Sequence, residues 1–144
     1  MPENFVQLAP IPVLRVLADL NAGGPASAMA RLEAKLPSIK GRKFYGTFRP
    51  TPAGEEYFAC VARVDSDDPI RMGLDVGEIP GGWYARRKIT DWSKDLGQLA
   101  RQFTEMIRIL GENVDTGRPE IEFYRSQTEM FVLVPVHSPE RKNA

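Results

Sequence analysis

Apolar residues recur at helical spacing in one stretch of the chain, between residues 96 and 110. They lie three or four positions apart on one face of about four helical turns: Leu96, Leu99, Ala100, Phe103, Met106, Ile107 and Leu110. Asp91 or Ser93 can cap the start of this helix, and Gly111 can end it. The pattern therefore predicts a long amphipathic helix with one buried face.

A shorter helix is predicted near the start of the chain. Gly23-Gly24-Pro25 marks a turn that places proline at a favourable first helical position. Met29, Leu32 and Leu36 then follow at helical spacing, and Pro37 ends the element because proline cannot continue a helix.

The remaining apolar stretches favour strands. An acidic loop (residues 65–69) and a loop rich in turn-forming residues (50–54) separate some of them, and a Pro-Gly-Gly bend (80–82) interrupts another. The predicted extended segments are 5–20, broken by two prolines, then 41–48, 56–64, 72–89, 120–125 and 130–136.

The order strand, helix, strand, strand thus occurs twice, and short sequence matches support a duplication. The matches are Ile11-Pro12 with Ile79-Pro80, Gly41-Arg42 with Gly117-Arg118, Phe44-Tyr45 with Phe123-Tyr124, and Phe58 with Phe131. We predict one domain over residues 1–138, with repeats at about 4–65 and 72–137 and a polar tail at 139–144.

Two βαββ units favour an α+β fold. Related by a pseudo-twofold axis, they can join edges to form one curved antiparallel sheet that carries both helices on one face. The opposite face then forms a groove on the duplication axis, which is a natural place for a small-molecule site.

Strand alternation predicts which side chains line this groove. The predicted helix-facing residues are Phe44, Phe48, Phe58, Cys60, Ile121, Phe123, Phe131 and Leu133. The predicted groove-facing residues are Tyr45, Thr47, Tyr57, Val61, Glu120, Glu122, Tyr124, Met130 and Val132. Trp83 and Tyr84 point in opposite directions, and the glycine bend leaves open which of them faces the groove.

Tyrosines around a carboxylate suit a flat, hydrophobic cation, because aromatic faces stack on it and attract its charge. A carboxylate in a poorly hydrated site is also stabilised by a positive ligand. The alternative interpretation is an ordinary amphipathic sheet with tyrosines at its rim and solvated glutamates.

Composition narrows the functional classes. The 144 residues include 19 basic and 19 acidic side chains, so the chain lacks the broad positive field of a nucleic-acid-binding protein. A single cysteine and a single histidine argue against a disulfide, a multi-cysteine zinc site and histidine-dependent hydrolases. We expect a cytoplasmic protein with no signal peptide, membrane span, nucleic-acid partner, metal or cofactor.

At this point the sequence resembles the GyrI-like small-molecule-binding domain, which is also the effector-binding domain of multidrug-sensing transcription activators. The resemblance rests on Gly24-Pro25, FYGTFRPTPAGEEYFACVARV (44–64), EIPGGWYA (78–85) and RPEIEFYRSQTEMFVLVPV (118–136). It implies the duplicated fold and a central pocket for hydrophobic, often cationic, compounds. The buried glutamate of the family's Glu-x-Tyr strand falls on Glu122, beside Tyr124, and Tyr45 matches the aromatic residue of the first repeat.

The chain departs from the family pattern in two places. It has no helix-turn-helix segment, so we do not expect it to activate transcription by itself. Its second helix begins TDWSKDL rather than with the expected Gly-Pro, which places the pocket rim on that side in question.

Three functions follow as hypotheses. The first is a stand-alone binding protein for sensing or sequestration, with Glu122 as the anchor and Tyr45, Tyr57, Trp83 and Tyr124 as walls. The second is a metal-independent hydrolase of cyclopropane-containing genotoxic natural products, as some similar proteins are, using Glu122 beside a tyrosine. The third is a protein-interaction role like that of the family's gyrase-inhibiting namesake, with an unknown partner, for which the local feature is the acidic cluster Asp65, Asp67 and Asp68.

Overall fold

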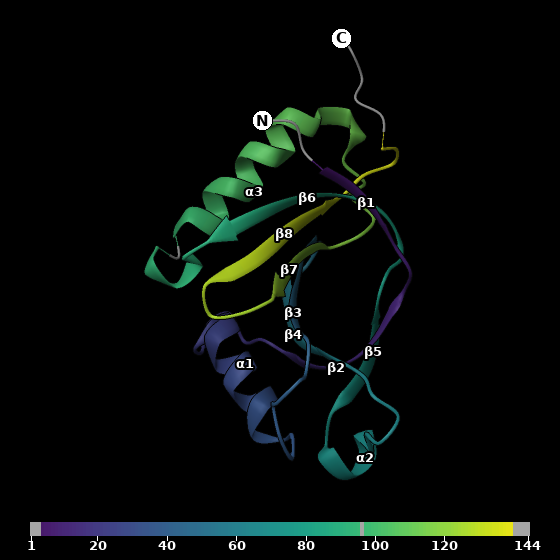
Figure 1. The fold of residues 1–144 in the computed structure, drawn as a ribbon, viewed down its shortest axis with the longest axis vertical. Coiled ribbons are helices and arrows are strands. Elements are labelled where there is room, and N and C mark those ends of the chain that lie inside the picture. Colours follow the sequence, from purple (N-terminus) through teal and green to yellow (C-terminus); the bar gives the residue numbers. More distant parts are fainter. Residues whose placement is uncertain (1–3, 96, 140–144) are drawn as a thin grey trace. The chain divides into compact units, whose positions relative to one another are not determined.

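The computed structural model describes residues 4–95 and 97–139 (Figure 1). The strands are β1 (Asn4–Leu8), β2 (Ile11–Leu17), β3 (Phe44–Thr51), β4 (Gly54–Ala62), β5 (Asp75–Ile79), β6 (Gly82–Thr90), β7 (Glu120–Tyr124) and β8 (Glu129–Pro135). The helices are α1 (Gly24–Ala34), α2 (Pro69–Met72) and α3 (Gly97–Leu110), with short 3-10 turns η1 (Trp92–Lys94) and η2 (Gly111–Asn113).

The chain divides into two compact units. The continuous unit is Pro10–Ile79, and the split unit combines Met1–Ala9 with Pro80–Ala144. In the continuous unit the antiparallel strand order is β3-β4-β2-β5, and α1 packs on β2 and β4. In the split unit the order is β1-β6-β8-β7, and α3 lies along β6 and β8 (Figure 1). The predicted α+β class with two βαββ units is confirmed.

Each unit also contains one strand that lies, in the sequence, directly before a strand of the other unit. β1 is joined to β2 by two residues, yet it pairs with β6 of the split unit. β5 is joined to β6 by two residues, yet it pairs with β2 of the continuous unit. The repeating sequence unit is therefore ββαββ, and the two copies exchange their first strands.

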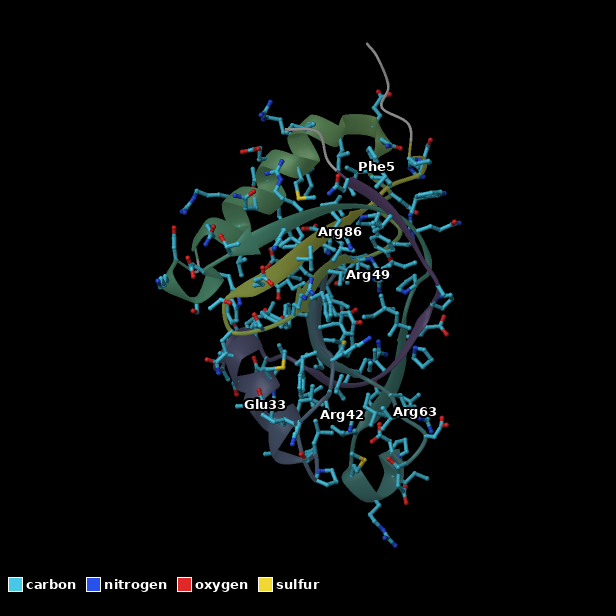
Figure 2. All side chains as sticks on the ribbon, in the orientation of Figure 1. Phe5, Glu33, Arg42, Arg49, Arg63 and Arg86 are labelled. Atoms are coloured by element: carbon cyan, nitrogen blue, oxygen red, sulfur yellow. The ribbon has the colours of Figure 1, made fainter. Side chains whose placement is uncertain are left out.

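Cross-strand register shows which residues correspond in the two units. If Phe58 of β4 corresponds to Phe131 of β8, then Cys60 corresponds to Leu133, two residues further along. The cross-strand partners of these two residues are Arg15 and Arg86, which therefore correspond as well. Both arginines cover these phenylalanines: the guanidinium carbon of Arg15 lies 3.9 Å from the ring centre of Phe58, and that of Arg86 lies 4.7 Å from Phe131. Figure 2 labels Arg86 on β6. This shared cation–π pair supports the correspondence.

The same register supports some of the predicted sequence matches and contradicts others. It matches Gly41-Arg42 with Gly117-Arg118, as predicted. The match of Ile11-Pro12 with Ile79-Pro80 is wrong, because the register that matches Arg15 with Arg86 carries Ile11 onto Gly82. The match of Phe44-Tyr45 with Phe123-Tyr124 is also wrong, because Phe123 corresponds to Thr47 and Tyr124 to Phe48.

The two predicted helices form, with one correction to a boundary. Pro25 lies in the first turn of α1, after two glycines with positive φ. Neither Asp91 nor Ser93 caps α3 (Gly97–Leu110): Ser93 lies in the separate turn η1, and Asp91 precedes that turn with a left-handed φ of 52°. Leu99, Phe103, Met106 and Leu110 pack on the sheet as predicted. Ala100 and Ile107 were predicted for the same buried face, but both are exposed. Leu96 lies outside the described residues.

The helix α2 was not predicted, since the sequence placed residues 65–69 in a solvated loop. The carboxylate of Asp68 accepts a hydrogen bond from the backbone N–H of Arg71 at 3.2 Å and so caps the helix. Gly73 ends α2 in a left-handed conformation. Asp-Pro at the start and glycine at the end were the available signals.

The predicted assignment of strand faces is wrong in the split unit. Met130, Val132 and Val134 pack with α3, so the opposite set of side chains points away from the helix. Register places Ile121 with Leu133 and Phe123 with Phe131 on that far face, where the two phenylalanine rings stack at 6.3 Å. On β8 both sets of side chains are apolar, so alternation separates the two faces correctly without showing which one the helix covers.

In the continuous unit the prediction is right for β3 and wrong for β4. Phe44 and Phe48 pack toward α1, as predicted. Tyr57 and Val61 are their cross-strand partners and also lie in the cluster beneath α1, contrary to prediction. Phe58 and Cys60 therefore point away from the helix. Burial raises the pKa of the Cys60 thiol to about 12.

No helix in the described part of the chain is long and apolar enough to cross a membrane.

Candidate functional site

Strand β7 places acidic and aromatic side chains on the helix-bearing face of the split unit. Glu122 lies opposite Val132, and Tyr124 lies opposite Met130. Both partners belong to the apolar cluster beneath α3, and Tyr124 packs against that cluster. Alternation along the strand brings Glu120 to the same face. Two carboxylates thus share a face that is built mainly from apolar side chains.

Tyr124 and Glu122 are joined directly. The hydroxyl of Tyr124 donates a hydrogen bond to Oε1 of Glu122 at 2.6 Å. The Trp92 ring meets Tyr124 edge-on, with ring centres 5.2 Å apart and an interplanar angle of 63°. Trp92 is held in turn by a 3.1 Å hydrogen bond from Nε1 to the backbone oxygen of Ser126 in the β7–β8 turn. The cluster therefore combines a carboxylate, a phenol and an indole with defined orientations.

Glu120 is the second carboxylate of this face and is partly buried. Its pKa is raised, first by burial and then by the negative charge of Glu122. Among the residues that the structure describes, none forms a hydrogen bond or an ion pair with the Glu120 carboxylate. A positive group between the Glu120 and Glu122 carboxylates would stabilise their charged forms and lower the pKa of Glu120 again.

Arg87 lies on the same helix-bearing face, on strand β6. It is the cross-strand partner of Val132, which is also the partner of Glu122, so one strand separates the two charged residues. Two strand spacings amount to about 9–10 Å between their backbones. Nη1 of Arg87 donates to Oε1 of Gln102 at 2.6 Å and to Oε1 of Glu105 at 3.0 Å, both on α3.

The continuous unit has apolar residues or glycine at each corresponding position. Register matches Glu120 with Phe44, Glu122 with Gly46, and Arg87 with Val16. Phe44 and Val16 pack against the cluster beneath α1, where Tyr57, Ala59 and Val61 are buried. The same arrangement of strands and helix therefore forms without charges at these positions, so the charges in the split unit are not needed for the fold.

Trp83 lies on the helix-bearing face as well, but at the far end of β6. It packs against the cluster beneath α3 and is the partner of Gln7 in β1. Four residues of strand separate it from Arg87, or about 13 Å. Within the split unit, the structure does not bring Trp83 to the Glu122 carboxylate.

Tyr45 and Tyr57 were predicted to share a face, and the structure places them on opposite faces of the continuous unit. Tyr57 is 4% exposed beneath α1 and pairs with Phe48. Tyr45 pairs with Cys60 on the face away from α1, and burial raises the pKa of its hydroxyl. Residues 45 and 57 have the same parity in the sequence, but antiparallel register pairs odd positions of one strand with even positions of the other.

Trp92 and Arg87 were not predicted to belong to the site. Trp92 precedes the predicted helix, where a tryptophan is ordinarily a packing residue. Arg87 is the middle of the run Arg86-Arg87-Lys88, and its alternation with apolar positions was the available signal. Arg86 and Lys88 point away from α3, so Arg87 is the member of the run that faces the helix.

The acidic cluster near α2 has local structural roles. Both carboxylate oxygens of Asp67 accept hydrogen bonds from Arg42, at 3.1 and 2.8 Å, and Oδ2 also accepts from the backbone N–H of Val64. Asp68 caps α2. Two of the three acidic side chains considered for a protein interface are therefore engaged within the chain.

Neither a family model nor a curated protein sequence matches this chain. Solved structures do match it. SAV2435 bound to tetraphenylphosphonium superposes with a TM-score of 0.66 at 14% identity, covering 96% of this chain and 95% of that one. A hydrolase from Listeria innocua gives a TM-score of 0.61 at 11% identity, with 94% and 93% covered. An integron cassette protein of Vibrio cholerae gives 0.59 at 14% identity, with 93% and 95% covered. At these identities the chain shares their fold.

Proposed function

We propose that the chain is a GyrI-like binding protein for hydrophobic, positively charged organic compounds, acting by sensing or sequestration. Glu122 is the anchor for the positive charge, and Tyr124 and Trp92 are the aromatic surfaces beside it. Binding of this kind needs neither a metal nor a cofactor.

The observation that carries this proposal is the contrast between corresponding positions in the two units. Carboxylates on an apolar, helix-covered face cost stability unless a positive charge compensates them. The continuous unit avoids this cost with Phe44 and Gly46, whereas the split unit has Glu120 and Glu122. A ligand cation between an indole, a phenol and two carboxylates gains both cation–π attraction and ion pairing.

A structure with the same fold supports the ligand class. SAV2435 was solved with tetraphenylphosphonium, a bulky aromatic cation. A bulky aromatic cation is also the type of compound that the Glu122–Tyr124–Trp92 cluster favours, since its charge is spread over apolar surface and weakly hydrated.

The test is a titration of the wild type and Glu122→Gln with tetraphenylphosphonium, followed by tryptophan fluorescence and calorimetry. We expect Glu122→Gln to weaken binding about tenfold or more, the effect of removing a charge-assisted contact. Glu129→Gln is the matched control, because Glu129 lies next to the site on β8 but faces away from α3 and pairs with Lys88. Equal affinity in the wild type and Glu122→Gln would refute the proposal.

A second candidate function is hydrolysis of a strained electrophile such as a cyclopropane. The 2.6 Å hydrogen bond from Tyr124 to Glu122 favours it, because a carboxylate oriented by a phenol can position an attacking water. A protein of the same fold is described as a hydrolase. Mass spectrometry distinguishes the two functions: a gain of one water in the compound, abolished by Glu122→Gln while binding persists, would establish hydrolysis, whereas intact compound supports binding alone.

A further inference from the structure

The candidate site has a negative end, formed by Glu120 and Glu122, and Arg87 adds a positive end on the same face. Its backbone lies two strands from Glu122 on the same helix-bearing face, with Val132 between them. Its side chain is 17% exposed, so its charge is poorly screened by water. The contacts with Gln102 and Glu105 hold the guanidinium between the sheet and α3.

The fold itself does not need a guanidinium at this position. The corresponding residue of the continuous unit is Val16, which packs beneath α1 with its neighbours. A half-buried arginine costs desolvation that a valine avoids. The contacts with Gln102 and Glu105 stabilise the guanidinium at this position.

We propose that Arg87 makes the site selective for amphoteric ligands, whose cationic aromatic part binds at Glu122, Tyr124 and Trp92 and whose anionic group binds the guanidinium of Arg87. This inference rests on the function proposed above and names the ligand class more narrowly. The sheet sets the spacing of the two residues, at about 9–10 Å between their backbones.

The two ends of the site act in opposite directions on a simple cation. Such a ligand gains from the carboxylates but is repelled by Arg87 across a weakly screened distance. A ligand that also carries a carboxylate converts this repulsion into a charge-assisted hydrogen bond. Arg87 therefore lowers the affinity for the first type of ligand and raises it for the second.

Three matched phosphonium compounds test this: butyltriphenylphosphonium, (4-carboxybutyl)triphenylphosphonium and the methyl ester of the latter. They share the aromatic cation, and only the second has a negative end. In the wild type we expect the carboxylate compound to bind about tenfold more tightly than its ester, the contribution of one charge-assisted contact.

Arg87→Met should remove this preference, because the carboxylate compound loses affinity and the simple cation gains it. Arg87→Lys keeps the charge and should retain part of the preference, which also guards against a folding defect in the methionine variant. Arg86→Met is the matched control: Arg86 is the next residue on β6, it faces away from α3 and it covers Phe131. It should leave the order of the three affinities unchanged.

The outcomes separate this inference from the function on which it rests. If all three compounds bind in a Glu122-dependent manner but equally well, or if Arg87→Met changes their affinities in parallel, Arg87 has only a structural role and the inference is wrong. If none of the three depends on Glu122, the proposed function fails first. Selectivity lost in Arg87→Met and partly restored by lysine supports the inference.

Discussion

The two units of the chain keep the same features on one face of their strands and differ on the other. On the faces away from the helices, both cover a phenylalanine with an arginine, Arg15 on Phe58 and Arg86 on Phe131. On the helix-bearing faces, Phe44 and Val16 of one unit stand where Glu120 and Arg87 stand in the other. Residues that serve the shared architecture have persisted in both copies, and the charges that distinguish one copy belong to the binding site that we propose.

A second shared feature is an arginine just before the third strand of each ββαββ repeat, and removing the first of these arginines, Arg42, should have the largest effect on stability. Arg42 contacts Asp67 and the backbone oxygen of Ala62, and the Asp67 side chain is only 4% exposed (Figure 2 labels Arg42). Arg42→Met leaves that carboxylate buried without its cation, which should cost about 3 kcal/mol in the free energy of unfolding, measured in urea.

The corresponding variant, Arg118→Met, should cost less, about 1–2 kcal/mol. Arg118 donates to backbone oxygens of Trp83 and Val136, but its carboxylate partner Asp115 is 26% exposed and can be solvated. The double variant Arg42→Met/Asp67→Leu should recover part of the loss, since it removes the buried charge as well. A greater cost for Arg118→Met than for Arg42→Met would show that burial of the carboxylate is not the deciding factor.

The next effect concerns the helix-bearing face directly. Phe44→Glu gives the continuous unit the residue that the split unit has as Glu120. It removes a ring that packs beneath α1 and adds a carboxylate to an apolar cluster, so unfolding should become easier by about 2 kcal/mol. Phe44→Leu, which keeps the position apolar, should cost clearly less. Equal losses would mean that shape rather than charge determines what this face accepts.

The smallest effect is expected at Glu120, and its sign depends on pH. The folded chain binds the Glu120 proton more tightly than the unfolded chain, because burial and Glu122 raise the pKa above its ordinary 4.5. The stability that this group contributes is therefore present below pH 4.5 and declines as the pH rises through the raised pKa. Glu120→Gln should flatten this decline and raise stability at neutral pH by less than about 1 kcal/mol.

Urea unfolding of the wild type and Glu120→Gln at several pH values between 4 and 8 checks this, with Glu129→Gln as the control. Glu129 bonds to Lys88, which lowers its pKa, so its loss should have the opposite pH dependence. Cation affinity of the wild type should rise with pH over the range in which Glu120 loses its proton. An affinity that is constant over this range would exclude Glu120 from the site.

The element order and the duplication could be predicted from the sequence because they depend on local signals. Helical periodicity, proline positions and glycine bends are properties of neighbouring residues, and they located α1, α3 and most strands within a few positions. The helix α2 was missed because four residues between a capping aspartate and a glycine are too short for periodicity to be visible.

The faces and the partners of the strands could not be predicted in the same way. Alternation grouped Glu122 with Tyr124, and their hydrogen bond confirms that they share a face, but nothing local shows which face a helix covers. Tyr57 was misplaced because register relates strands that are distant in sequence. The exchange of β1 and β5 was missed for the same reason, since a two-residue link ordinarily joins strands that pair with each other.

This exchange also determines the order in which the chain can fold as it is synthesised. All strands of the continuous unit have been made once Ile79 has been added to the chain. β1 is made first of all, yet its partner β6 begins only at Gly82 (Figure 1 shows both strands side by side). Until then the earliest strand of the nascent chain presents an unpaired edge, which is the kind of surface on which growing chains associate.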